Sequence, residues 1–290
     1  MKVLLLGARG QLGKALLRSV LDDVELIPIT RKQLRITDES CYFKLLKRYQ
    51  PDWVINACAY TDVEKAETEC TEAYQVNCEF PFRLAYYCNL LSIKLLHMST
   101  DYVFNGDQLT PYKPDDFCQP LNVYGESKYL GERMILNITE DPGGVVILRT
   151  SWLMSENPGN FCTKMIRLLG SQKELRVIND QWGGPTTTHS LSKAIWKIIR
   201  ITKLPNVMHY CDMGQASWFD VASLIRIYAS GRELVSNPAT VIPVPSSEYE
   251  TAALRPSYSV LDSSETYDIT GIKPTSWVET IHDIVSRIFR

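Results

Sequence analysis

A glycine-rich loop near the start of the chain constrains the fold more than any other feature of the sequence. Gly7, Gly10 and Gly13 stand in the segment GARGQLG, after the apolar run KVLLLG and before the amphipathic residues 12–21. Glycines at this spacing permit a tight strand-to-helix turn and let backbone N–H groups approach a pyrophosphate at a helix N-terminus. Because the loop lies between a predicted strand and a predicted helix, it indicates a dinucleotide-binding fold.

The first half of the chain alternates short apolar runs with longer amphipathic segments. Continuous apolar strands that alternate with helices are typical of a parallel sheet covered on both faces. The predicted fold class is therefore α/β, a Rossmann-type doubly wound parallel sheet. We expect strands at residues 2–7, 24–30, 52–58, 93–100 and 144–152, and helices at 12–21, 39–49, 70–91 and 122–136, with Pro81 breaking the third helix.

The pattern loosens after Trp152. Helical segments are predicted at residues 160–170, 190–200, 217–229 and 276–289, between stretches rich in Pro and Ser. We expect residues 1–152 to form the dinucleotide-binding domain. Residues 153–290 are expected to form mainly a smaller substrate-binding lobe, packed on the carboxyl edge of the sheet, with the chain crossing back to the first domain in places.

Composition excludes several classes of partner. The chain of 290 residues carries a net charge of −2 without a basic block, so we expect no nucleic-acid partner. No apolar run approaches the roughly 20 residues needed to span a bilayer, so no membrane partner is expected. The eight cysteines form no C-x-x-C pair and have no histidines clustered beside them, so no metal site is predicted. We interpret them as free thiols in a reducing cytoplasm.

A basic cluster follows the second predicted strand, which ends at Thr30. NAD-binding folds place an acid about 20 residues after the glycine loop, where it binds the ribose 2′-hydroxyl. Here Arg31, Lys32 and Arg35 occupy that region, and Asp38 comes only later. Cations favour a 2′-phosphate, so the cluster predicts NADPH as the preferred cofactor and NADH as the second candidate. Solvated surface charges remain the alternative.

Three polar residues suggest the chemistry. Thr100 stands at the carboxyl end of the fourth predicted strand, the edge at which open parallel sheets bind ligands. Tyr124 and Lys128 lie one turn apart on the next helix and share one face. A nearby ammonium is expected to lower the pKa of the tyrosine, making its phenol a proton donor near neutral pH. We predict these three residues to be catalytic.

With these motifs in place, the sequence resembles the extended short-chain dehydrogenase/reductase superfamily, and more closely its dTDP-4-dehydrorhamnose reductase group. The resemblance covers nearly the whole chain. It rests on the segments GARGQLG, PDWVINACAYTDVEKAE, QVN, STDYVFNG, PLNVYGESKYLGE, LRTSWL, NFCTKMIRL, VINDQWGGPT and LRPSYSVLD. It implies NAD(P)H-dependent reduction of the C4 carbonyl of dTDP-4-dehydro-L-rhamnose, with a nucleotide sugar as the substrate.

The resemblance also implies roles for individual residues. Tyr124 protonates the carbonyl oxygen, Lys128 tunes Tyr124 and binds the nicotinamide ribose, and Thr100 hydrogen-bonds the carbonyl. Trp152 packs on the sugar and Arg255 meets the diphosphate; a core tryptophan and a structural ion pair are the alternatives. Cofactor contacts are implied for Gly7, Gly10, Gln11, Leu12, Gly13, Ala59, Tyr60, Thr61, Met98, Tyr124 and Lys128, and substrate contacts for Thr100, Asp101, Tyr124, Trp152 and Arg255.

Two departures from the group's pattern matter. Arg35 replaces an acid expected near the adenine, which strengthens the NADPH prediction. Ala15 stands where some members use an acid for a magnesium-linked dimer, so no metal is carried over and a homodimer stays open. Two other functions also stay open. One is reduction of another nucleotide-linked keto-deoxy sugar, as in a dihydrostreptose synthase. The other is a non-catalytic regulatory subunit, as in a relative that partners methionine adenosyltransferase.

Overall fold

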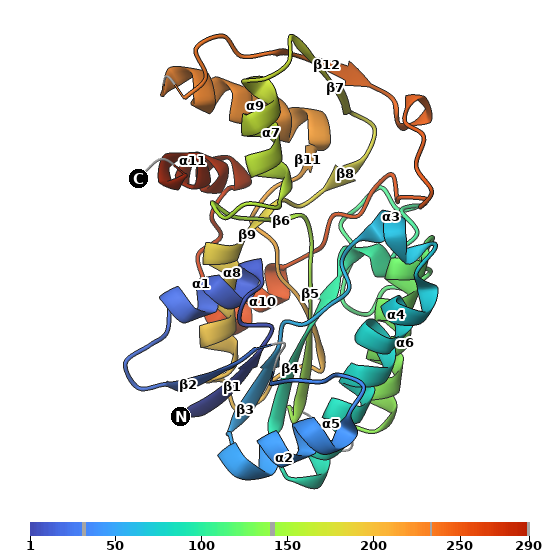
Figure 1. Cartoon of the computed structure of the whole chain (residues 1–290), viewed down its shortest axis with the longest axis vertical. Coiled ribbons are helices and arrows are strands. Elements are labelled where there is room, and N and C mark those ends of the chain that lie inside the picture. Colours follow the sequence, from blue (N-terminus) through green and yellow to red (C-terminus); the bar gives the residue numbers. More distant parts are fainter. Residues whose placement is uncertain (31–32, 140–142, 233, 289–290) are drawn as a thin grey trace.

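The computed structural model describes residues 1–30, 33–139, 143–232 and 234–288. Its centre is a six-stranded sheet in which every pair of neighbouring strands is parallel. The strands are β1 (Lys2–Leu6), β2 (Glu25–Ile29), β3 (Trp53–Asn56), β4 (Lys94–Thr100), β5 (Val145–Thr150) and β10 (Val207–His209), in the order β2-β1-β3-β4-β5-β10. The predicted Rossmann-type sheet is confirmed (Figure 1).

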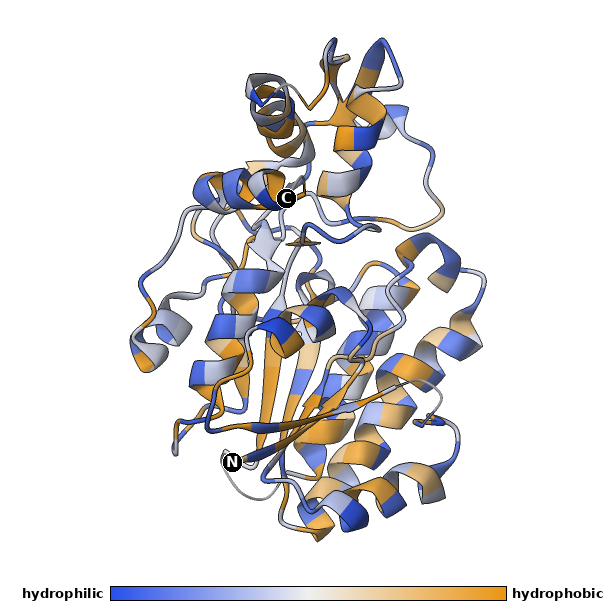
Figure 2. Ribbon diagram, turned by 60° about the vertical axis from the view of Figure 1, so that its left-hand side comes forward, coloured by the Kyte–Doolittle hydropathy of each residue, from blue (hydrophilic) through white to orange (hydrophobic). Residues whose placement is uncertain are grey.

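Helices cover both faces of this sheet. One face carries α1 (Gln11–Arg18), α8 (Thr188–Ile198) and α10 (Ser264–Thr270), and the other carries α2 (Glu39–Tyr49), α5 (Phe80–Leu90) and α6 (Val123–Asn137) (Figure 1). Strand β1 shows why its sequence is continuously apolar. Val3 and Leu5 pack into the core beneath α1 and α8, whereas Leu4 and Leu6 pack into the core beneath α2 and α5. Apolar residues accordingly gather on the strands and on the helix faces that cover them (Figure 2).

The segment predicted as one long helix with a break at Pro81 is helical without a gap from residue 70 to residue 90. α4 (Cys70–Tyr74) leads into a π-helical turn (Gln75–Glu79), and α5 follows with Pro81 in its first turn. Pro81 comes just after the π-helical turn, where the hydrogen-bond register of the helix changes. The π-turn places Asn77 so that its amide bonds both the N–H and the C=O of Tyr60, at 2.9 and 3.0 Å. The π-helical turn therefore fixes a loop at the carboxyl edge of the sheet.

A second lobe lies beyond the carboxyl ends of the strands (Figure 1). Its helices are α7 (Phe161–Leu169), α9 (Trp218–Gly231) and α11 (Trp277–Arg287). Three short strand pairs complete it: β6 (Leu153–Met154) with β9 (Thr186–Thr187), β7 (Glu174–Ile178) with β12 (Thr240–Val244), and β8 (Trp182–Gly183) with β11 (Ala216–Ser217). Short helical segments are α3 (Val63–Ala66), η2 (Asp101–Val103) and η3 (Ser246–Glu248). Among the described residues, no helix has the length and apolarity that crossing a membrane requires.

A buried ion pair joins α6 to the sheet. The guanidinium of Arg149 on β5 donates to Glu132 on α6, with an Nη2–Oε2 distance of 2.7 Å and Nε bonds of 3.1 Å to both oxygens. Arg149 also donates to the carbonyl of Pro114 at 3.1 Å. Both charged side chains are almost fully buried, so each depends on the other for compensation of its lost hydration. The pair therefore anchors α6 against β5.

We expect Glu132→Gln to lower the free energy of unfolding by about 3–5 kcal/mol, because it leaves the Arg149 guanidinium buried without a counter-charge. Asp23→Asn is the matched control, since the Arg200–Asp23 pair is exposed and exposed pairs contribute about 0–1 kcal/mol. Urea denaturation followed by circular dichroism measures both. Equal losses in the two variants would contradict a structural role for the buried pair.

Candidate active site

Loops that follow β1, β3 and β4 meet at the carboxyl edge of the sheet and enclose a cleft with two chambers. The outer chamber has a volume of about 500 Å³ and the inner chamber about 560 Å³. Both are bordered by Gly10, Ala57, Ala59 and Thr61, so they are continuous. Predicted site residues line both chambers. Those of the outer chamber are Gly7, Gly10, Ala59, Tyr60 and Thr61. Those of the inner chamber are Gly10, Gln11, Leu12, Ala59, Thr61, Met98, Thr100, Asp101, Tyr124, Lys128 and Trp152.

The glycine loop turns tightly between β1 and α1. Gly7 has a φ of +81°, and the N–H of Gly10 closes the turn on its carbonyl at 2.9 Å. A Cβ on Gly13 would lie 2.3 Å from the Gly7 oxygen and 2.7 Å from Ala8 Cα. These contacts require glycine, because a side chain would push the helix start away from the strand. The loop thereby brings the N-terminus of α1 to the cleft, which fits a pyrophosphate.

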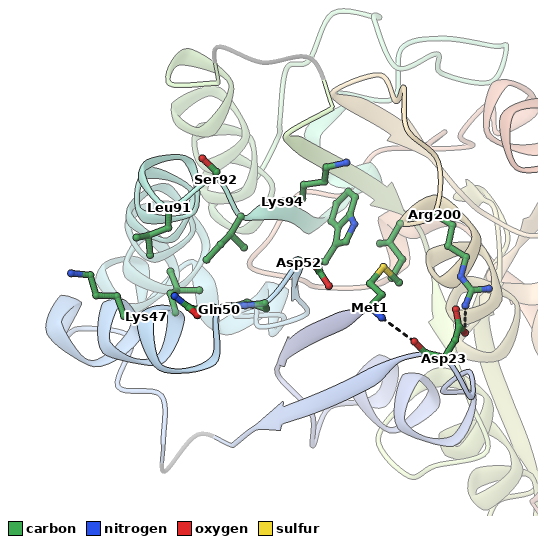
Figure 3. A pocket seen from close by; sticks show the side chains of 14 residues that line it. Met1, Asp23, Lys47, Gln50, Asp52, Leu91, Ser92, Lys94 and Arg200 are labelled. Atoms are coloured by element: carbon green, nitrogen blue, oxygen red, sulfur yellow. Dashed lines mark hydrogen bonds and ion pairs between the residues drawn. The ribbon is translucent and has the colours of Figure 1, made fainter.

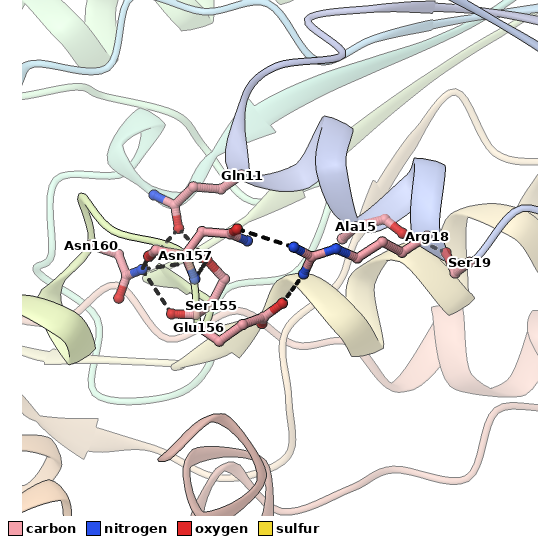
Figure 4. A network of polar contacts seen from close by, with 8 residues as sticks. All are labelled: Gln11, Ala15, Arg18, Ser19, Ser155, Glu156, Asn157 and Asn160. Carbon is pink, nitrogen blue, oxygen red and sulfur yellow. Dashed lines mark hydrogen bonds and ion pairs between the residues drawn. The ribbon is translucent and has the colours of Figure 1, made fainter. Parts of the chain in front are cut away.

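The side chain of Gln11 lies against the lobe (Figure 4). Its Oε1 accepts from Ser155 Oγ at 2.9 Å and from Asn160 Nδ2 at 3.2 Å, and its Nε2 donates to the Gly159 carbonyl at 3.4 Å. At the other end of α1, Arg18 pairs with Glu156. Gln11 was expected to touch a cofactor pyrophosphate; its side chain is engaged by the lobe, which leaves its backbone N–H for that contact.

The three predicted catalytic residues are brought together in the inner chamber. The Thr100 hydroxyl hydrogen-bonds the Tyr124 phenol and donates to Asp101 Oδ1 at 3.1 Å. Asp101 Oδ2 accepts from Ser259 Oγ at 2.6 Å. Asn122 caps α6 by accepting from the N–H of Gly125 at 2.8 Å, which fixes the first turn that carries Tyr124. A hydroxyl, a phenol and a lysine amino group thus border one chamber.

Burial dominates the electrostatics of these groups. It raises the pKa of Tyr124 to about 12, with Asp101 adding to the rise and the Thr100 hydrogen bond opposing it. From the sequence, the ammonium of Lys128 was expected to shift this pKa in the opposite direction. That expectation is wrong for this structure because burial of the phenol is the largest influence on it; Lys128 Nζ donates to the Met98 carbonyl at 2.6 Å. Tyr124 therefore stays protonated through the neutral range.

Desolvation also raises the pKa of the Asp101 carboxyl to about 7, against the lowering from its bonds with Ser259 and Thr100. For Lys128, burial lowers the pKa to about 8. Both groups consequently change protonation near neutral pH. Perturbed titrating groups gathered in a cleft are characteristic of catalytic sites.

The wall of the inner chamber opposite the sheet is formed by the lobe. Trp152, with a φ of +44°, stacks on Trp218 with ring centroids 3.5 Å apart and an angle of 6° between the planes. A Cβ on Gly183 would come within 2.4 Å of the Trp152 ring, so glycine is needed beneath it. Trp218 and Asn160 line the same chamber and were missed by the sequence analysis. A capping box at residues 160–163 is the one local signal that marked Asn160.

Two buried hydroxyls in the inner chamber lack a partner within the described part of the chain. Ser99 Oγ and Thr150 Oγ1 stand at the carboxyl ends of the adjacent strands β4 and β5. Buried hydroxyls are normally hydrogen-bonded, so their orphan state indicates that a ligand or water completes them. Together with the glycine turn, they fit a chamber built to hold a polar molecule such as the nicotinamide half of a dinucleotide.

Two of the predicted cations form ion pairs. Arg35 is exposed, pairs with Asp38 at 3.7 Å, and borders a separate shallow hollow with Lys44 and Arg48. Arg255 forms an ion pair with Glu64 at 2.5 Å, as in the structural alternative that the sequence left open. The remaining two predicted cations, Arg31 and Lys32, fall outside the described residues.

A larger hollow of about 1070 Å³ lies at the opposite end of the sheet (Figure 3). It is bordered by the amino ends of strands and by Trp53, Lys94 and Arg200. Its acids have partners, since Asp52 accepts from the N–H of Lys2 at 2.6 Å and Asp23 pairs with Arg200. Parallel sheets bind ligands at their carboxyl edge, so size alone does not make this hollow the site.

Comparison with known proteins gives the cleft its family context. The RmlD substrate binding domain family matches residues 1–289. The chain belongs to this family. Among RmlD relatives, dTDP-4-dehydrorhamnose reductase of Aggregatibacter actinomycetemcomitans is 34% identical over 290 residues, covering 98% of both chains. A dTDP-4-keto-6-deoxy-D-glucose reductase of Streptomyces niveus is 37% identical over 261 residues, covering 89% of this chain and 87% of that protein.

A solved structure agrees with both the fold and the family. The crystal structure of dTDP-4-dehydrorhamnose reductase from Bacillus anthracis in complex with NADP superposes on this chain with a TM-score of 0.90. The two sequences are 34% identical, and 98% of each chain is covered. The RmlD fold thus extends over the sheet and the lobe together.

We expect Gly13→Ala to weaken NADPH binding by at least about tenfold. The added methyl group overpacks the turn, which costs roughly 1–3 kcal/mol and shifts the N-terminus of α1. Gly231→Ala is the control, since a Cβ there meets no atom within 4 Å. Isothermal titration calorimetry with NADPH measures the effect, and thermal melting shows whether each variant is folded. A folded Gly13→Ala protein with unchanged affinity would contradict the assignment of the loop.

Proposed function

We propose that the protein reduces the C4 carbonyl of dTDP-4-dehydro-L-rhamnose to give dTDP-L-rhamnose, with NADPH as the preferred reductant and NADH as the second. The observation that carries the proposal is the inner chamber. There the glycine loop, the Thr100, Tyr124 and Lys128 groups, and the aromatic wall of the lobe face one another across about 560 Å³. A chamber of this size suits a nicotinamide ring and a sugar side by side.

Tyr124 is proposed as the proton donor. Reduction of a ketone adds a hydride to carbon and a proton to oxygen, so the donor must start in its protonated form. The pKa of Tyr124, raised to about 12 by burial, keeps the phenol loaded at neutral pH. As the carbonyl oxygen gains negative charge, the phenol transfers its proton to that oxygen. Lys128 in its ammonium form then stabilises the tyrosinate that remains.

Thr100 and Asp101 are proposed to orient the carbonyl. The Thr100 hydroxyl borders the chamber next to Tyr124 and is held by Asp101, which is in turn held by Ser259. These bonds hold the Thr100 oxygen in place beside Tyr124, and its single hydrogen, which points to Asp101 Oδ1 in this structure, would turn to the reacting oxygen when the substrate binds. Thr100 therefore aligns the substrate, while Tyr124 supplies the proton.

The cofactor is proposed to lie along both chambers. NADPH supplies the hydride from its nicotinamide ring. The backbone of the glycine loop would hold the pyrophosphate, at Gly7, Gly10, Gln11 and Leu12. The loop after β3 would flank the cofactor with Ala59, Tyr60 and Thr61. The nicotinamide half would adjoin Met98, Tyr124 and Lys128. Gly13 contributes through the packing of the turn. The orphan Ser99 and Thr150 hydroxyls support a polar ligand in the inner chamber.

Trp152 and Asp101 are proposed to face the sugar. An indole face packs well on the apolar side of a sugar ring, and the stack on Trp218 holds it in place. For Arg255 we propose a positioning role instead of a diphosphate contact, since its guanidinium is paired with Glu64. The pair ties the segment before Ser257 to α3 at the rim of the cleft.

We also propose a division of roles between the two halves of the chain, a cellular location and an oligomeric state. Residues 1–152 would mainly bind the cofactor and residues 153–290 mainly the substrate, with α8, β10 and α10 crossing back to the sheet. A cytoplasmic location is supported by the lack of any disulfide among the described cysteines. A homodimer is proposed without a magnesium bridge, since Ala15 offers no ligand; light scattering after size exclusion tests it.

The second candidate function is reduction of dTDP-4-keto-6-deoxy-D-glucose itself. It is favoured by the 37% identity to the Streptomyces niveus protein, which is named dTDP-4-keto-6-deoxy-D-glucose reductase. Purified protein with NADPH and each sugar separates the two, with product stereochemistry read by NMR. Faster turnover of the D-gluco sugar would favour this candidate, and absence of turnover with both would favour a non-catalytic subunit.

We expect Tyr124→Phe to reduce kcat by about 10²–10⁴, because the phenyl ring keeps the packing and removes the transferable proton. Oxidation of NADPH with dTDP-4-dehydro-L-rhamnose, followed by absorbance, measures the rate. Tyr86→Phe is the control, because Tyr86 is exposed on α5. A Tyr124→Phe enzyme with the full rate would overturn the assigned proton donor while leaving the fold intact.

We expect kcat/KM to be higher for NADPH than for NADH, because cations after β2 attract the 2′-phosphate. Replacing Arg31, Lys32 and Arg35 together with Ala should lower this preference by about tenfold. Arg35→Ala alone should change it little, since Arg35 pairs with Asp38 beside a different hollow. An unchanged preference in the triple variant would reduce the cluster to surface charge.

A further inference from the structure

Three polar side chains form a buried row behind the inner chamber. Asn56 ends β3, His97 lies in β4, and Lys128 comes from α6; their exposed fractions are 0%, 0% and 1%. Asn56 and His97 are register partners on adjacent parallel strands. Asn56 Nδ2 lies 3.0 Å from His97 Nδ1, and His97 Nε2 lies 3.2 Å from Lys128 Nζ. Polar groups so deeply buried must satisfy one another.

The backbone fixes the direction of these hydrogen bonds. The N–H of Cys58 donates to Asn56 Oδ1 at 3.1 Å. A backbone N–H can only donate, so the Asn56 oxygen must face it and the amide nitrogen must face His97. An amide nitrogen also only donates, so His97 Nδ1 must carry its lone pair. A neutral imidazole then bears its hydrogen on Nε2.

The consequence falls on Lys128. An Nε2–H of His97 points at Nζ, and an ammonium has three N–H groups and no lone pair. A neutral amine has the lone pair that could accept. The bond from Nζ to the Met98 carbonyl at 2.6 Å suits both forms, so it does not decide between them. The imidazole therefore disfavours the ammonium relative to the amine.

Other charges around the row do not reverse this arrangement. On α6, Glu132 raises the pKa of Lys128, but its oxygens are committed to Arg149 from β5. Cys58, after β3, adds a smaller rise. Beyond β4, Asp101 is engaged by Ser259 and by Thr100. Burial is the largest influence, and it lowers the pKa of both Lys128 and His97.

We propose that Asn56 and His97 are positioning residues that hold an imidazole N–H against Lys128 Nζ and thereby set the protonation state of the active-site lysine. The proposal deepens, and rests on, the proposed ketone reduction. There the ammonium form of Lys128 stabilises the tyrosinate, so kcat falls as pH rises and Lys128 loses its proton. The pair thus determines where the alkaline limb of the pH profile lies.

The first experiment needs no substrate. Protein labelled with ¹⁵N-histidine contains four histidines, and His97→Gln assigns the His97 signals by their loss. We expect His97 to be neutral and in the Nε2–H tautomer throughout the pH range in which the protein is folded. An Nδ1–H tautomer, or protonation near neutral pH, would overturn the proposal. Because no turnover is involved, this result stands apart from the fate of the proposed function.

The second experiment reverses the hydrogen bonds. In Asn56→Asp the carboxylate can accept from both the Cys58 N–H and a His97 Nδ1–H, so the imidazole presents its Nε2 lone pair to the ammonium. We expect the NMR tautomer to switch and the alkaline limb of kcat to move upward by about one pH unit. A switched tautomer with an unmoved alkaline limb would overturn the proposal. The tautomer is measured as well because the added charge or a change in stability does not by itself require the imidazole to switch.

His97→Gln gives an independent test if Asn56→Asp does not fold. The glutamine amide can turn its oxygen toward Nζ, so the alkaline limb should also move upward. His282→Gln is the matched control, since His282 is exposed on α11 and should leave the profile unchanged. A His97→Gln enzyme with reduced stability and the wild-type limb would assign His97 a structural role only and refute the proposal.

Discussion

The buried ion pair between Glu132 and Arg149 is the interaction on which the geometry of the site depends. Tyr124, Lys128 and Glu132 follow one another at four-residue steps and so share one face of α6. Arg149 is the register partner of Ser99, next to the strand end that carries Thr100. The pair holds Glu132 and so fixes the rotation of α6 about its axis. With that rotation fixed, Tyr124 and Lys128 on the same face reach the inner chamber. Its desolvation is costly, but the specificity of this alignment explains why an apolar pair would not serve the site equally well.

Burial lowers the pKa of Lys128, and the direction of the hydrogen bond from His97 acts on the same group. Lys128 lies between the Met98 carbonyl, which accepts, and the His97 imidazole, whose orientation is decided at Asn56 by one backbone N–H. In a low-dielectric interior such a chain is effective because no water can correct a mismatched donor. In the sequence, Lys128 and Tyr124 stand as an isolated pair on a helix, which predicts a lowered tyrosine pKa. In the structure, burial raises the pKa of Tyr124 instead.

Local patterns predicted the parts of the structure that local physics determines. The glycine loop, the apolar strands and the shared face of Tyr124 and Lys128 each follow from spacing within a few residues. The three-residue strand β10 gives no such pattern, because its place beside β5 depends on long-range pairing. Likewise, the stacking of Trp152 on Trp218 joins residues far apart in the chain. The pairing of Arg255 with Glu64 was equally open until the fold was known.

The same long-range contacts couple the two halves of the cleft. Gln11 belongs to the loop that turns between β1 and α1, yet its amide is bonded by Ser155 and Asn160 of the lobe. Asn160 also caps α7, so the amide connects the N-termini of two helices, one from each side of the cleft. Any movement of the lobe against the sheet must stretch these bonds, which lie at the border of the inner chamber. The position of the aromatic wall and the shape of the glycine turn are therefore not independent, and the proposed substrate and cofactor sites share the hydrogen bonds of Gln11.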